Sequence, residues 1–104
     1  MADPVMAEPL WKLENFIERF DDWAERDSPS VDVRFHVLRW TMSRSEDPYR
    51  RAHRQPEFDN YWFAVVPDSQ DGKGTVVMCA YWIEESGRTV RCDRYGTLSP
   101  PLDI

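Results

Sequence analysis

Residues 27–48, "DSPSVDVRFHVLRWTMSRSEDP", decide which fold this chain adopts. Read with a period of two, apolar and polar residues alternate over 31–37 and, after a slip of one position, over 38–43, which indicates a strand with one bulge. Read as a helix, the segment has Ser28 and Pro29 for its first turn and Pro48 as its stop. The two interpretations stay open at this level, because the β-branched residues favour the strand and the prolines favour the helix.

The helical interpretation of residues 31–43 has a consequence of its own. It places two apolar stripes on opposite sides of the helix: Val31, Phe35, Leu38 and Met42 on one side, and Val33, Val37 and Trp40 on the other. A helix of this kind must be sandwiched between two layers, one of them the core of the domain.

Residues 10–26, "LWKLENFIERFDDWAER", carry the clearest helical pattern. Their apolar side chains recur at a spacing of three and four, and Pro9 suits a first helical position. The opposite face is acidic. The pattern predicts an amphipathic helix with one face toward the core.

The second half of the chain predicts strands. Segments 58–67, 75–84 and 88–98 are rich in β-branched and aromatic residues, and "ESG" joins the last two as a hairpin. Residues 44–57 have no sustained period and predict a loop. We therefore expect a single α+β domain over residues 1–104, with flexible tails at 1–8 and 99–104. Its N-terminal amphipathic helix, or a helical hairpin if 31–43 is helical, packs on one face of a twisted antiparallel sheet of three to four strands.

Composition excludes several classes of protein. A chain that is 41% hydrophobic and 13% aromatic is too apolar to be disordered. Its apolar runs are too short to span a membrane, and its first residues do not resemble a secretory signal. We therefore expect a cytoplasmic protein with no membrane contact and no cofactor.

The net charge of −6 is distributed unevenly. Residues 1–30 carry net −5 and residues 57–104 carry net −4, whereas residues 31–56 carry net +3 and both histidines. The molecule as a whole repels nucleic acid at long range, so only its middle segment and isolated arginines can meet a phosphate backbone.

The two cysteines, Cys79 and Cys92, fall on neighbouring strands. A four-residue loop from Glu84 to Gly87 places them opposite each other, and a two-residue turn at Ser86 and Gly87 shifts the register by two but keeps both on one face. Either register predicts two buried, reduced thiols that act as small hydrophobic side chains. Without a CxxC motif or nearby histidines, we expect no metal site.

The sheet face opposite the core is the candidate site. Its alternation gathers Arg91, Asp93 and Tyr95 with Trp82 nearby, and turns one charged residue, Arg94, inward unless the strand ends there. The basic loop adds further binding residues, which are Arg50, Arg51, His53 and Arg54. Arginine for phosphate, tyrosine or histidine for proton transfer and tryptophan for base stacking suit RNA cleavage by 2′-hydroxyl attack, which needs no metal.

The order of these elements resembles the small toxins of the RelE/ParE superfamily. The similarity covers residues 10–96 and includes "EDPYRRA", "YWFAVV", "GTVVMCAYWIEE" and "RTVRC". It implies a helical hairpin on an antiparallel sheet, an antitoxin or other protein partner, and RNA or a protein as target, with Arg91 for phosphate and Tyr95 as the late-strand tyrosine. The chain departs from the family in its acidity and its "PPLDI" tail, and the strand expected before the first helix has only "VMAEPLWKL" as a candidate.

Two other functions fit the same residues. One is an acidic module that binds a basic protein without catalysis, as inhibitors and immunity proteins do. The other is a cavity protein of the cystatin or NTF2 type, in which aromatic side chains line a pocket. A helix at 31–43 favours the toxin-like interpretation, and a strand there favours either alternative.

Overall fold

The computed structural model describes residues 9–70 and 74–99, and in it the deciding segment is a helix, α2 (Val31–Ser43). Ser30 is its N-cap, and the Ser30 side chain accepts a hydrogen bond from the Val33 amide at 3.2 Å. The predicted start at Ser28 was two residues early. Ser28 instead ends the preceding helix in a left-handed conformation, and its amide donates to the Ala24 carbonyl at 3.0 Å.

The first helix, α1 (Phe16–Asp27), begins six residues later than predicted. Asn15 has a φ of 66°, a left-handed conformation that a helix cannot include, so the helix starts after it. The residues before it form a short strand, β1 (Lys12–Glu14), which overlaps the last two residues of the candidate segment "VMAEPLWKL" and extends one residue beyond it.

The sheet has five strands in the order β1-β5-β4-β3-β2. Three of them are the predicted strands, β3 (Tyr61–Val65), β4 (Val76–Glu84) and β5 (Thr89–Leu98), which pair antiparallel. The other two are β1, which pairs parallel with β5, and β2 (His53–Arg54), which pairs antiparallel with β3. The sheet is therefore larger than the predicted three to four strands, because elements of two or three residues leave no periodic signal.

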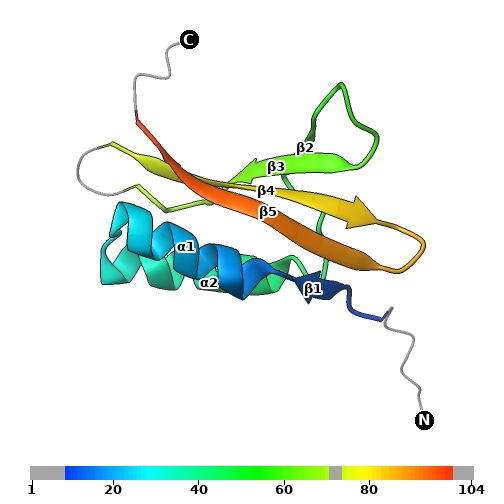
Figure 1. Cartoon of the computed structure of the whole chain (residues 1–104), viewed down its shortest axis with the longest axis horizontal. Coiled ribbons are helices and arrows are strands. Elements are labelled where there is room, and N and C mark those ends of the chain that lie inside the picture. Colours follow the sequence, from blue (N-terminus) through cyan, green and yellow to red (C-terminus); the bar gives the residue numbers. More distant parts are fainter. Residues whose placement is uncertain (1–8, 71–73, 100–104) are drawn as a thin grey trace.

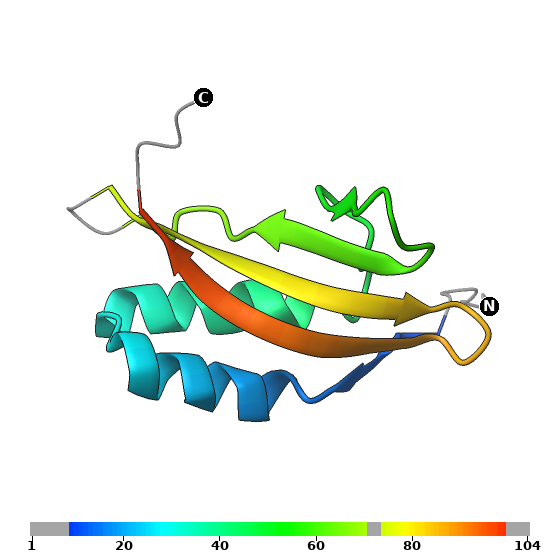
Figure 2. The ribbon, with the colours of Figure 1, turned by 45° about the horizontal axis from the view of Figure 1, so that its top comes forward.

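Both helices lie side by side on one face of this sheet, and no described helix covers the other face (Figures 1 and 2). The core between the layers is aromatic: Phe16, Phe20 and Trp23 from α1 pack on Tyr81 and Tyr95 from the sheet. One apolar face of each helix is thus buried against the sheet, which leaves the opposite sheet face available for function.

One prediction falls outside this description, and the description bears on another. The tails expected at 1–8 and 99–104 lie outside the described residues, apart from Ser99. Of the helices in the described segments, neither has the length and apolar character to cross a membrane.

Candidate functional site

The sheet face away from the helices carries two rows of cross-strand neighbours. From β5 toward β2, the first row is Arg91, Trp82 and Tyr61, and the second is Arg94, Ala80, Phe63 and His53. Between the two rows, Trp62, Tyr81 and Cys92 point the other way, into the core, and only Asp93 on β5 departs from this alternation. We call these two rows the open face. The open face spans four adjacent strands, with two arginines on β5 and aromatic rings on β4, β3 and β2.

A β-bulge on β5 creates this arrangement. Tyr81 pairs with Cys92, but Ala80 pairs with Arg94, so Asp93 is left as the extra residue. The bulge places both Asp93 and Arg94 on the exposed side, which resolves the inward-pointing arginine that strict alternation demanded. It therefore brings a second arginine to the open face beside Arg91.

The same bulge turns Tyr95 the other way. Tyr95 is only 2% exposed, and its hydroxyl lies 2.6 Å from Thr41 Oγ1 on α2. The prediction that Tyr95 shares the outer face with Arg91 is wrong, because one extra residue reverses the direction of every side chain that follows it. Tyr95 is a core residue with no access to a substrate on the open face.

An aromatic cluster stands where Tyr95 was expected. The ring centroids of Tyr61 and Trp82 lie 4.4 Å apart, and Phe58 packs edge-on against both at 5.6 and 5.7 Å. Trp82 was predicted at the site, and Tyr61 was missed. The signal for Tyr61 is the alternation in "YWFAVV", where Trp62, Ala64 and Val66 form the core set and leave Tyr61 outside.

Tyr61 also has a charged partner. Its hydroxyl donates to Asp93 Oδ2 at 2.5 Å. Partial burial, this hydrogen bond and the negative charge of Asp93 together raise the pKa of Tyr61 to about 12. At neutral pH Tyr61 is therefore a proton donor and cannot act as a base.

The two arginines of the open face are not engaged by the acidic side chains near them, Glu14 on β1 and Asp93 on β5. Within the described segments, neither the Arg91 nor the Arg94 side chain forms an ion pair or a hydrogen bond. Arg91 is half-buried beside Trp82 and Arg94 is exposed. Free guanidinium groups next to aromatic rings are suited to phosphate and base recognition.

The basic loop does not form one wall around Arg91. His53 lies on β2 with its ring 5.5 Å from Phe63, and Arg54 donates to the Phe58 carbonyl at 2.7 Å, so these two flank the open face. Arg50 and Arg51 instead line a separate cavity of about 220 Å³ near the end of β3. Three strand spacings separate β2 from β5, roughly 14 Å.

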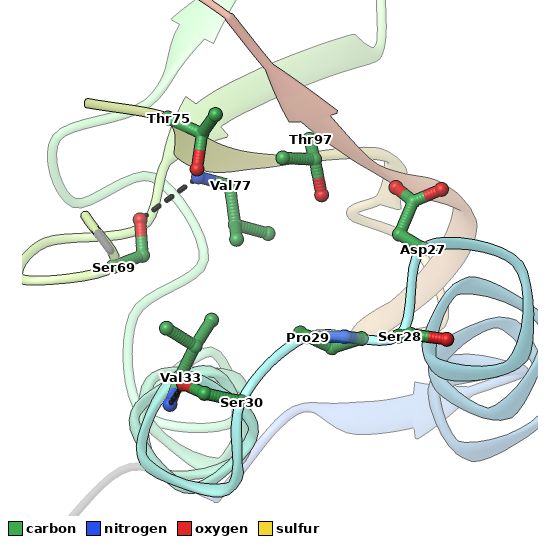
Figure 3. Close-up of a pocket in the computed structure, with 9 residues that line it drawn as sticks. All are labelled: Asp27, Ser28, Pro29, Ser30, Val33, Ser69, Thr75, Val77 and Thr97. Atoms are coloured by element: carbon green, nitrogen blue, oxygen red, sulfur yellow. Dashed lines mark hydrogen bonds between the residues drawn. The ribbon is translucent and has the colours of Figure 1, made fainter. Parts of the chain in front are cut away.

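A larger cavity, of about 360 Å³, lies between the α1–α2 turn and the ends of β4 and β5 (Figure 3). Hydroxyl groups of Ser69, Thr75 and Thr97 surround it, and among the described residues that line it Asp27 alone is charged. Ser69 Oγ accepts a hydrogen bond from the Val77 amide at 2.9 Å, so this hydroxyl is already engaged. None of the described residues that line the cavity is a cation, and the cavity lies on the helix side of the sheet.

The cysteines are buried, as predicted. Cys79 and Cys92 are both free, and their sulfur atoms lie 3.8 Å apart. The register is the shifted one, with Cys92 opposite Tyr81, and burial raises the pKa of the Cys79 thiol well above its ordinary value. Among the described residues no group of three or more histidine, cysteine or acidic side chains is arranged to hold a metal.

No family model matches the sequence, and no curated protein matches it. Among solved structures, the toxin–antitoxin complex RelBE2 from Mycobacterium tuberculosis contains a chain of similar fold. The TM-score is 0.55 at 15% sequence identity, and the match covers 94% of this chain and 100% of that chain. The chain thus shares its fold with a chain of that complex, as the order of its elements predicted, while its function has to be argued from its own site.

Proposed function

We propose that this protein is a toxin-type protein that binds single-stranded RNA on the open face and is held in check by an antitoxin. The observation that carries the proposal is the row of Arg91, Trp82 and Tyr61, with Arg94 brought beside it by the bulge. Unpaired arginines and clustered aromatic rings on a sheet are the combination that single-stranded nucleic acid requires.

Each part of the open face has a separate role in this proposal. A base stacks on the Trp82 and Tyr61 rings, which contributes about 1–3 kcal/mol per base. Arg91 and Arg94 bind the phosphates on either side through charge-assisted hydrogen bonds. Because the open face supplies only a few cations in a chain of net charge −6, binding depends strongly on salt.

The open face also holds the groups for cleavage without a metal. Attack by a 2′-hydroxyl forms a bond from that oxygen to phosphorus and breaks the bond from phosphorus to the 5′-oxygen, so one proton must leave and one must be supplied. Tyr61 retains its proton and can supply it, and Asp93, which accepts a hydrogen bond from Tyr61, can accept the other. Arg91 and Arg94 stabilise the charge that develops on the phosphate oxygens.

In this proposal the antitoxin binds the layer formed by α1 and α2, on the side away from the sheet. On α2 the stripe of Val31, Phe35 and Met42 is exposed, with Phe35 at 60%, and Leu38 is half-buried between them. A groove of about 520 Å³ continues from Met42 to Ile17 of α1. The second apolar stripe of α2 was expected to pack against a further layer, and this stripe and groove are where that layer would bind. An amphipathic helix fits such a surface.

The charge of this layer suggests the character of the partner. The exposed side of α1 carries Glu18, Asp21, Asp22 and Glu25. A docking helix with basic residues beside its apolar ones complements this surface. These four acids therefore lie on the helix layer, away from the open face.

Expression in growing cells tests the proposal. We expect wild-type protein to slow growth, and Arg91→Ala with Tyr61→Phe to relieve the effect without loss of fold. The matched control is Arg39→Ala with Tyr95→Phe, which removes the same groups from the helix side and should remain toxic. Normal growth with wild-type protein, together with capture of a basic protein that is lost after charge reversal on α1, would favour the non-catalytic binding module.

A further inference from the structure

Arg44, just after α2, is a buried cation with no counter-charge. The residue is 3% exposed, and no described acidic group lies within ion-pair distance of it. Asp47 is close enough to affect Tyr81, but its carboxylate accepts the Tyr49 amide instead. Burying an unpaired charge is costly, so this position calls for an explanation.

The groups around the guanidinium are all neutral. Nη1 donates to the carbonyls of Arg50 at 2.9 Å and Pro48 at 3.4 Å and to the Tyr81 hydroxyl at 3.3 Å. Nε and Nη2 reach only Ser43 Oγ, at 3.4 and 3.3 Å. Nη2 carries two hydrogens, and a single long contact engages at most one of them. The donors are thus fixed in place but not saturated.

The same guanidinium lines the cavity of about 220 Å³ at the end of β3, which we call the edge cavity. Trp40 forms another part of its wall, and the Arg44 Cζ lies 4.6 Å from the centre of the Trp40 ring. The edge cavity is therefore bounded by an aromatic face and an immobilised cation.

Two more arginines line the edge cavity. Arg50 and Arg51 are exposed, and neither side chain has an ion pair or hydrogen bond to the part of the chain that the structure describes. Arg51 has a φ of 55°, so the chain takes a left-handed turn at this point. No acidic residue of segments 9–70 and 74–99 lines the cavity.

We propose that the edge cavity is a binding site for a phosphate group, held by Arg44, Arg50 and Arg51. A phosphate supplies the missing counter-charge and accepts the unused Arg44 donors in the planar geometry that guanidinium groups prefer. The edge cavity lies at the end of β3, and β3 is two strand spacings, roughly 10 Å, from the strand that carries Arg91. The inference does not rest on the RNA proposal, since the phosphate can be free or part of a nucleic-acid backbone.

Titration with inorganic phosphate at constant ionic strength, against chloride, tests the site. The Arg44 Nε–Hε resonance is followed by NMR in three proteins. These are wild type, Arg50→Gln with Arg51→Asn, and the control Arg34→Gln with Arg39→Gln. Asparagine suits the left-handed conformation at 51. The control removes the same two charges from exposed positions on α2 that do not line the cavity.

We expect a saturable shift of the Arg44 resonance in wild type and control, and a loss of affinity of at least tenfold in the cavity variant. A short single-stranded RNA then identifies the source of the phosphate. Displacement of phosphate by RNA assigns the site to a backbone phosphate, and simultaneous binding of both assigns it to a free one. No phosphate-specific shift in wild type, or an equal loss in variant and control, would overturn the proposal.

Discussion

Replacing Tyr95 by phenylalanine tests two views of its hydroxyl. The structure buries this hydroxyl in the core, whereas the sequence-based hypothesis placed it on the outer face of the sheet. Thr41 Oγ1 has one hydrogen, which it donates to the Val37 carbonyl at 2.8 Å. The contact of 2.6 Å between Thr41 and Tyr95 must therefore be a hydrogen bond donated by the tyrosine. Tyr95→Phe removes that one donor and leaves the Thr41 donor satisfied, with the ring still packed on Phe20 and Trp23.

The expected cost follows from these contacts. Loss of one buried hydrogen bond without a cavity lowers the free energy of unfolding by about 1 kcal/mol. For a domain of this size that shifts the melting temperature by roughly 4–8 °C. Thr41→Val should cost more, about 1–3 kcal/mol, because it leaves the Tyr95 hydroxyl buried without an acceptor. The double variant should then be more stable than the sum of the two single changes predicts.

Denaturant unfolding of the four proteins measures these values, and growth on expression measures function. We expect Tyr95→Phe to be destabilised and fully toxic. A Tyr95→Phe protein of wild-type stability that no longer slows growth would refute the reasoning, because it would place the hydroxyl on a substrate and outside the core.

Three further predictions concern the core and its titration. Cys79→Ser should lower the free energy of unfolding by about 1–3 kcal/mol, since the new hydroxyl lacks partners. Thiol reagents should label Cys79 and Cys92 only after denaturation, and two reactive thiols in the native protein would contradict this. Trp23→Ala should cost about 3–5 kcal/mol, measured by denaturant unfolding, because the ring is fully buried; an unchanged midpoint would show that α1 is peripheral. The pKa of each of the four tyrosines is raised by burial, with Tyr49 and Tyr61 at about 12, so the unfolded state loses these protons first. The free energy of unfolding should be insensitive to the phenols below pH 10 and fall from pH 10 toward 12, and phenolate absorbance near pH 10 in the folded protein would contradict it.

The parts of the fold that follow from periodicity were predictable. The three long strands and the core face of α1 were read from the spacing of their apolar residues. The helix at 31–43 was not decided by spacing, because its residues satisfy both periods. It is the packing of Val33 and Val37 on the sheet that selects the helical one, and an isolated stretch of sequence contains no information on that contact.

Only part of the candidate site could be predicted from the sequence, because one extra residue, Asp93, changes which side chains of β5 face outward. Arg91 and Trp82 follow from alternation along their strands, and both lie on the open face. The bulge at Asp93 has no local sequence signature beyond the inward-pointing charge at Arg94. Once the bulge is introduced, Arg94 joins the site and Tyr95 leaves it. Arg44 was missed because its burial depends on how the segment after α2 folds back against Tyr81 and the end of β3, which the local sequence does not show.

The most direct test of the central claim is the affinity of a short single-stranded RNA as a function of salt. It should be measured for wild type, for Arg91→Ala with Arg94→Ala, and for the control Arg34→Ala with Arg39→Ala. Two lost phosphate contacts should reduce the slope of log affinity against log salt by about 1.4. The account predicts that reduction in the open-face variant and a slope like that of wild type in the control. No RNA binding by the wild-type protein at low salt, or the same slope in all three proteins, would contradict it.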